Sequence, residues 1–315
     1  MSASADSGSS GTPTAKKRVT PKERRSASQW AVAWRRFRRN KVGLAGLVLV
    51  GFFVLAALYG LFFAPFPPRS FDCLYQGCTS LPPFVNWAHP LGTERSGIDI
   101  YSEILHAIPN DFYVGLGATA ISVAIGLVVG ALAGYRRGFS AALLLGLTQV
   151  FLVIPVLVFI LVFARIFVLE VAQGFGLSLI TIILGFFGWP TIAYIVRGEI
   201  LRIRELEFIQ AEKAIGAGSA RIVFRHIVPN ILSSIIVVSS LLIAGNILTE
   251  VVISFLGFGT PNISTLGLLL NEGFASIRAT WWVSLFPGLA VVLIVLGFNL
   301  LGDGLSDALN PRLRE

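Results

Sequence analysis

The sequence has few charged residues, only two cysteines and no ATP-binding motif. Only 13% of its 315 residues are Asp, Glu, Lys or Arg, about half the share of a typical soluble domain, whereas 55% are hydrophobic. No G-x-x-x-x-G-K-[ST] phosphate-binding loop occurs, so the chain cannot hydrolyse ATP by itself. Its three histidines form none of the common hydrolase or metalloprotease motifs. We therefore expect a non-catalytic integral membrane protein with no cofactor or metal of its own.

Hydrophobic runs dominate what is present. A helix needs about 20 mostly apolar residues to cross the hydrocarbon core, because it rises about 1.5 Å per residue. Six runs have this length: Leu44–Phe63, Phe112–Gly134, Ala141–Phe163, Leu177–Val196, Ile231–Ile253 and Trp282–Leu301. We predict an all-α fold in which residues 44–315 form one domain of six transmembrane helices.

The positive charges predict the orientation of these helices. If the N-terminus is cytoplasmic, 21 of the 25 Lys and Arg residues lie on the cytoplasmic side, as expected for a membrane protein. Both termini are then cytoplasmic, residues 1–43 form a basic cytoplasmic tail and residues 64–111 an outside segment. Because the net charge of +8 is explained by topology, we expect no nucleic-acid partner.

The end of the basic tail is amphipathic. Between residues 29 and 41, Trp30, Trp34 and Phe37 fall on one helical face among several arginines. This pattern is typical of a helix that lies on the membrane lipid surface. Simple flanking charge that orients the first span is an equally good interpretation.

A loop between the fourth and fifth spans, residues 197–230, has the order helix, glycine, helix. Residues 205–215 read as a short helix with Phe208, Ala211 and Ile215 on one side and charges on the other. Gly216 breaks this helix, and Ser219 is predicted to cap the next turn. Pro229 fits the first turn of the fifth span. By itself this order fits an ordinary solvated loop as well as a docking element for a partner protein.

Four segments of the chain, which follow one another in the family's order, resemble the C-type permease subunits of the dipeptide/oligopeptide/nickel family of ABC importers. The loop carries Gln210-Ala211-Glu212-Lys213-Ala214-Ile215-Gly216 and then His226-Ile227-Val228-Pro229-Asn230, similar to that family's coupling motif. The other three segments are residues 89–99, residues 255–261 and residues 302–312. The resemblance implies a type I ABC importer permease fold, and it implies docking residues for the ATPase subunits: Gln210, Ala211, Glu212, Ala214, Gly216, Ala217, Arg221 and His226.

The chain also departs from the family pattern. Ile98 occupies a position where the family has Arg, and Ile108–Phe112 lacks the usual Gly-Ala-Arg before the second span. Gln210 and Glu212 replace the usual Glu and Ala of the coupling motif. The family's contacts on the outer side are therefore not transferred to this chain.

The resemblance implies partners and a location. It implies a second homologous permease subunit, two cytoplasmic ATPase subunits that bind ATP and Mg, and an extracytoplasmic solute-binding protein, all at a prokaryotic inner or plasma membrane. Dipeptides or oligopeptides are the expected cargo, with nickel chelates and oligosaccharides as alternatives. A secondary transporter or channel that works without ATPases is a different class, but neither inverted repeats nor a filter-like segment is evident.

Polar residues on the fifth span suggest a translocation path. Ser239, Asn246, Glu250 and Ser254 are spaced by seven, four and four residues, which places them on one helical face. Polar groups are costly in lipid, so this face should meet water or another helix. Lining of the path and hydrogen bonding between helices are equally good interpretations.

Three local patterns complete the prediction. Cys73 and Cys78 are the only cysteines, and in the predicted outside segment they could form a disulfide or remain two thiols; two cysteines alone do not make a zinc site. Gly126, Gly130 and Gly134 repeat every four residues, which predicts close helix packing. Pro155 and the Trp189-Pro190 pair are expected to kink the third and fourth spans or to loosen a turn in them.

Overall fold

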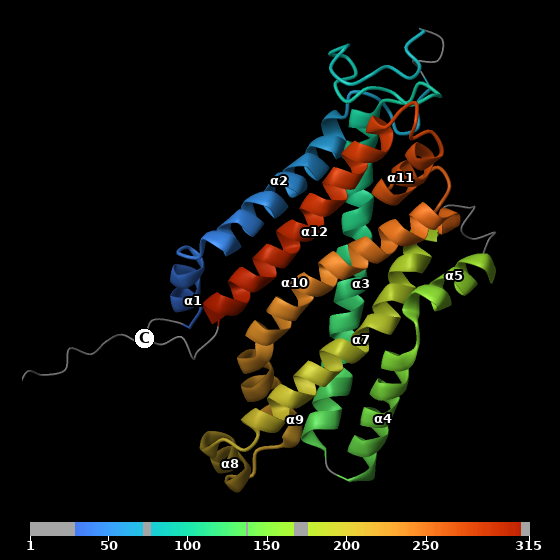
Figure 1. The fold of residues 1–315 in the computed structure, drawn as a ribbon. Helices are drawn as coiled ribbons and strands as arrows, with labels where there is room; N and C mark the ends of the chain where they lie inside the picture. Colours follow the sequence, from blue (N-terminus) through green and yellow to red (C-terminus); the bar gives the residue numbers. More distant parts are fainter. Residues whose placement is uncertain (1–28, 72–76, 137, 167–175, 310–315) are drawn as a thin grey trace, which may run out of the picture.

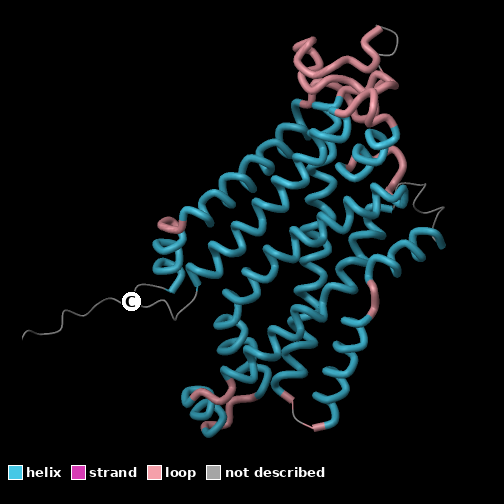
Figure 2. The backbone as a smooth tube through the Cα atoms, in the orientation of Figure 1, coloured by secondary structure: helices cyan, strands magenta, loops and turns pink. Residues whose placement is uncertain are grey.

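The computed structural model describes residues 29–71, 77–136, 138–166 and 176–309, and within these residues the protein is helical apart from loops and one isolated bridge between Thr93 and Asp99 (Figures 1 and 2). The elements are α1 (Gln29–Phe37), α2 (Lys41–Phe63), α3 (Ile100–Tyr135), α4 (Phe139–Val153), α5 (Val156–Ile166), α7 (Gly176–Ile203), α8 (Glu207–Ala214), α9 (Ser219–Arg221), the π-helical turn η3 (Ile222–Ile227), α10 (Val228–Ile253), the π-helical turn η4 (Ser254–Phe258), α11 (Leu266–Ala275) and α12 (Trp282–Leu309). The predicted all-α fold is confirmed.

The apolar helices match the predicted spans. Five of them are long and apolar enough to cross a membrane: α2, α3, α7, the continuous helix Ser219–Phe258 and α12. The third predicted span is a bent pair, Phe139–Val153 and Val156–Phe163, with an angle of 74° at the break. Pro155 lies at that break, so the predicted kink is confirmed. Counted as one span, this pair gives six spans among the described residues. Pro190 lies inside α7, which continues through it without a break.

Two helix pairs pack through glycine. On α3, a Cβ added to Gly126 would lie 2.8 Å from the Trp189 carbonyl of α7, and one added to Gly130 would lie 2.6 Å from the Ala193 carbonyl. These approaches are too close for any larger residue, which confirms the predicted glycine stripe. At the junction of α2 and α12, a Cβ on Gly43 would lie 2.9 Å from the Gly304 Cα.

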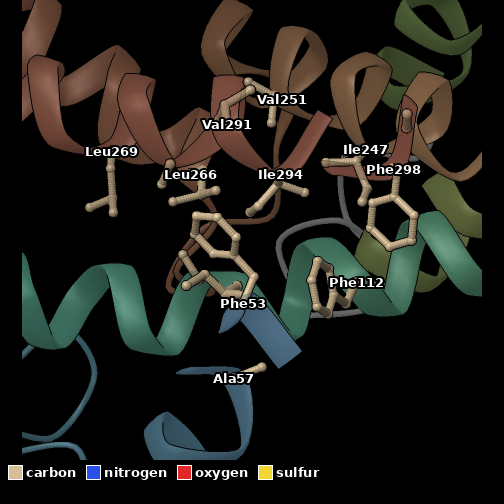
Figure 3. Packing of buried hydrophobic residues seen from close by; sticks show 14 residues of the cluster. Phe53, Ala57, Phe112, Ile247, Val251, Leu266, Leu269, Val291, Ile294 and Phe298 are labelled. Carbon is tan, nitrogen blue, oxygen red and sulfur yellow. The ribbon is translucent and has the colours of Figure 1, made fainter. Parts of the chain in front are cut away.

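A buried cluster joins α2, α3, α10, α11 and α12 (Figure 3). Phe53 of α2, Phe112 of α3 and Phe298 of α12 supply its aromatic rings, and Phe112 meets Phe298 edge to face at 5.9 Å. Leu266 of α11 and Ile247 of α10 pack beside them and are fully buried. This cluster fixes the short helix α11 against the long helices.

The two ends of the bundle differ. One end carries the cap segment, defined here as residues 64–71 and 77–99, and the opposite end carries α8 and α9 (Figure 1). The cap segment is bonded to the helices below it, because the Trp282 indole donates to the Thr93 carbonyl at 3.1 Å. Asp99 caps α3 by accepting from the Ser102 amide at 2.8 Å, so residues 100–111, assigned to the outside segment from the sequence, continue the helix.

Candidate functional site

Helix α8, in the loop between α7 and α10, is held to the bundle by one buried side chain. Ile209 of α8 has no exposed surface and packs in a cluster that includes Ile203 and Ile222. A fully buried isoleucine contributes about 1.5–3 kcal/mol of transfer free energy. Because α8 has only eight residues, this contact determines where the helix sits.

Large apolar side chains of the same loop face outward. Ile215 is 80% exposed, Phe224 65%, Phe208 46% and Leu206 42%. Single exposed apolar residues are ordinary, but four in one short loop at the tip of the protein are typical of a contact surface for another protein. The sequence pattern indicated Phe208 and Ile215 as one side of the short helix but not that this side is the free one.

Gly216 supplies the turn that follows α8. Its φ of 84° lies in the left-handed region, and its amide donates to the Lys213 carbonyl at 3.0 Å. The next amide, that of Ala217, donates to the Glu212 carbonyl at 3.0 Å, so the turn closes the helix as a glycine C-cap does. Ser219 does not cap the next turn as predicted, since Gly218 holds that position without a side-chain bond.

Polar contacts brace the two halves of the loop. His226 Nε2 lies 3.5 Å from Glu212 Oε1, and the Asn230 amide donates to the His226 carbonyl at 2.6 Å. The Gln210 amide donates to the Arg204 carbonyl at 2.9 Å. These bonds explain why a histidine and an asparagine stand at the start of α10.

The structure gathers the predicted docking residues in this loop. The exposed ones are Gln210, Ala211, Ala214, Gly216 and Arg221; Glu212, Ala217 and His226 are half-buried. Exposed backbone around small residues allows a partner to approach closely. Their role in docking stays a prediction.

Two cations link the loop to the end of α3. The Arg204 guanidinium donates to the Gly134 carbonyl at 2.9 Å, and the Lys213 ammonium lies 5.8 Å from the centre of the Tyr135 ring. A cation over an aromatic face contributes about 0.5–1 kcal/mol at an exposed site. Sequence reasoning missed both contacts because their partners are about 70 residues apart.

The predicted polar face of α10 lies largely inside the protein. Asn246, Glu250 and Ser254 are buried, and the Asn246 amide donates to the Thr119 hydroxyl of α3 at 3.0 Å. The Ser254 hydroxyl donates to Glu250 at 2.6 Å, and the Ser239 hydroxyl to its own helix. Asn246 therefore makes the interhelical bond that one interpretation expected, and the translocation path stays a prediction.

The cap segment is tied to α11 by an ion pair that the sequence did not indicate. The Arg69 guanidinium donates to both carboxylate oxygens of Glu272, at 2.7 and 3.0 Å. Cys73 of the predicted disulfide with Cys78 lies outside the described residues, so that bridge stays a prediction. Within the described ranges no group of three or more His, Cys, Asp or Glu could hold a metal ion.

Comparison with known proteins agrees with this architecture. The sequence model of the family described as "Binding-protein-dependent transport system inner membrane component" matches residues 126–315. A second model, described as "N-terminal TM domain of oligopeptide transport permease C", matches residues 28–83.

Curated relatives match along nearly the whole chain. The dipeptide transport system permease protein DppC of Bacillus subtilis is 33% identical over 297 residues, 93% of this chain and 89% of its own length. The oligopeptide transport system permease protein OppC of Mycobacterium tuberculosis is 36% identical, with 92% and 97% covered. The glutathione transport system permease protein GsiD of Escherichia coli is 34% identical, with 90% and 91% covered. This chain, an all-helical multi-pass membrane protein, therefore belongs to the inner-membrane permease family of binding-protein-dependent ABC importers.

Proposed function

We propose that this protein is the permease subunit of an ATP-driven importer of dipeptides or oligopeptides. It pairs with a second, homologous permease subunit, two cytoplasmic ATPase subunits bind the ATP and Mg, and an extracytoplasmic solute-binding protein delivers the cargo. The exposed apolar surface of the loop between α7 and α10 carries this proposal, because it is the kind of surface that a partner must cover. The peptide-transport names of the relatives support the cargo class.

The loop then acts as a lever. An ATPase subunit that grips Phe208, Ile215 and Phe224 moves α8, and the buried Ile209 carries that movement into the helix bundle. Arg204 and Lys213 pass it to the end of α3. Because α3 packs on α7 through backbone-close glycines, these two helices move together and not independently.

The charge distribution supports a cell-membrane location with both termini in the cytoplasm. Of the 25 Lys and Arg residues, 21 fall on the α8 side or in the terminal segments under this orientation. The cap segment would then face the solute-binding protein. Reporter fusions test the orientation: a cytoplasm-active reporter at either terminus should be active, and an inactive one would reverse it.

A glycine substitution tests docking. In Gly216→Trp the added Cβ has no atom within 4 Å, so the protein should insert into the membrane normally. Uptake of cargo should be lost, while ATP hydrolysis by the partner subunits continues or no longer responds to cargo. Gly138→Trp is a matched control, since Gly138 has a similar φ of 78° and equally open surroundings in another loop. Unchanged uptake in Gly216→Trp, or equal loss in both variants, would remove the docking role.

Affinity purification with native mass spectrometry identifies partners and cargo together. A second permease and two ATPase copies in the complex would establish the importer, and the mass of a ligand on the binding protein would separate peptides from nickel chelates and oligosaccharides. A chain that purifies alone after crosslinking would instead favour a transporter or channel without ATPases.

A further inference from the structure

Two acidic residues are buried side by side near the cap end of the bundle. Asp111 of α3 and Glu250 of α10 have no exposed surface. Their neighbours in sequence, Phe112 and Val251, belong to the buried cluster of Figure 3, as does Leu266, whose amide Asp111 accepts from, so the two acids border an apolar region. No part of the proposed transport mechanism assigns a role to this pair.

Both carboxyl groups point at the start of α11. The amide of Leu266, the first residue of α11, donates to Asp111 Oδ2 at 3.3 Å. Thr265, the N-cap of α11, accepts from the Leu268 amide, and its side chain lies near the Glu250 carboxyl group. The two acids therefore hold the beginning of the same short helix.

The carboxyl groups also contact each other. They are close enough to interact electrostatically, and Asp111 Oδ1 and Glu250 Oε2 have no donor among the residues that the structure describes. Two ionised carboxylates cannot bond to one another and repel, whereas one proton between them gives both oxygens a partner. The geometry thus needs one hydrogen that neither the backbone nor a hydroxyl supplies.

Among the described residues, no positive side chain pairs with either acid. Neither Asp111 nor Glu250 takes part in an ion pair of the described residues. The other acids on the helices that they join are bonded elsewhere: Glu103 of α3 accepts from the Arg69 amide and the Ser264 hydroxyl, and Glu272 of α11 pairs with Arg69. On α10, Glu250 is the only ionisable side chain.

We propose that Asp111 and Glu250 form a proton-binding site in which one shared proton keeps α11 locked onto α3 and α10. One proton leaves one negative charge on the pair, and the N-terminus of a helix favours a single negative charge. A second ionisation would place two negative charges in an apolar site and would push α11 away. Any movement that lifts α11 and admits water would release the proton, so the lock couples protonation to the conformation of the cap end.

Infrared spectroscopy of the purified full chain in lipid nanodiscs tests the shared proton directly. At neutral pH the wild-type protein should show the carbonyl stretch of a protonated carboxyl group, with a shift in heavy water. Asp111→Asn and Glu250→Gln should each abolish the same component, because the amide donates to the remaining carboxylate and no proton is needed. Asp303→Asn, which changes an exposed acid on α12, should leave it intact. Absence of the component in wild type, or its survival in either variant, would overturn the proposal.

Thermal unfolding against pH gives a second, independent readout. Raising the pH should remove the proton and lower the melting temperature of the wild type, whereas Asp111→Asn should lose this part of the pH dependence. An identical pH dependence in both proteins would contradict the lock. If sodium chloride, but not choline chloride, stabilises the wild type and not Asp111→Asn, the pair binds a metal cation and not a proton, which would also overturn the proposal. This inference does not rest on the transport function, since every measurement uses the isolated chain.

Discussion

Replacement of Ile209 by alanine should detach α8 from the bundle without unfolding the protein. Ile209 is fully buried, whereas the other side chains that hold α8, Gln210, Glu212 and Lys213, are partly or fully exposed to solvent. An isoleucine-to-alanine change in a core costs about 2–5 kcal/mol. If about 3 kcal/mol of this loss falls on α8 alone, the detached state becomes roughly 100 times more populated. The long helices keep their own packing, so the loss should stay local.

Hydrogen exchange measured by mass spectrometry follows this detachment. Peptides covering residues 207–214 should exchange much faster in Ile209→Ala, while peptides from α3 and α7 should not change. Ile215→Ala, at the C-cap of the same helix, is the matched control, because Ile215 is 80% exposed and its truncation leaves no cavity. Unchanged exchange of α8 in Ile209→Ala, or equal acceleration in Ile215→Ala, would refute the reasoning.

Three further changes probe the cap segment and the glycine packing. Arg69→Ala leaves Glu272 without its bidentate partner, at a cost of about 1–3 kcal/mol, and should speed proteolysis of the cap segment; undiminished resistance would contradict this. Burial and the negative charge of Glu272 raise the pKa of Glu94. The protonated carboxyl group therefore stabilises the cap segment at low pH, and this contribution is lost as the pH rises through the raised pKa. Glu94→Gln should flatten the dependence of the melting temperature on pH, and an unchanged profile would contradict this reasoning. Gly130→Val would overpack the contact with Ala193 and should destabilise the protein by about 1–3 kcal/mol in denaturant unfolding, whereas an unaffected midpoint would show that α7 can yield.

Much of the fold was predictable because hydrophobic length is a local property. Each span except the third is one continuous helix, and Pro155 marked the break in the third. The extension of α3 over residues 100–111 was not predicted, because Glu103, Asn110 and Asp111 lower the hydropathy there. These polar side chains are tolerated in a helix since they bond to the loop before α11 and to its first turn.

The candidate site divides in the same way. The helix, glycine, helix order of the loop follows from local sequence, and Gly216 has the backbone conformation that the pattern required. The sequence predicted the apolar face of the short helix but not that this face is exposed, because periodicity separates two faces of a helix without showing which one is buried. Ile209 settles this, and it lies on the face that the sequence did not mark as apolar. Long-range contacts such as Arg204 to Gly134 leave no local signal at all.

The helix α3 connects the two sites described here. It runs without a break for 36 residues, about 54 Å at 1.5 Å per residue. One end receives the contacts of Arg204 and Lys213 from the loop, and Asp111 meets Glu250 and the start of α11 near the other end. A continuous helix that is packed on α7 through glycine transmits a displacement along its axis with little bending. A displacement of the loop would therefore strain the contact between Asp111 and α11, and at this contact the shared proton keeps α11 bound to α3 and α10.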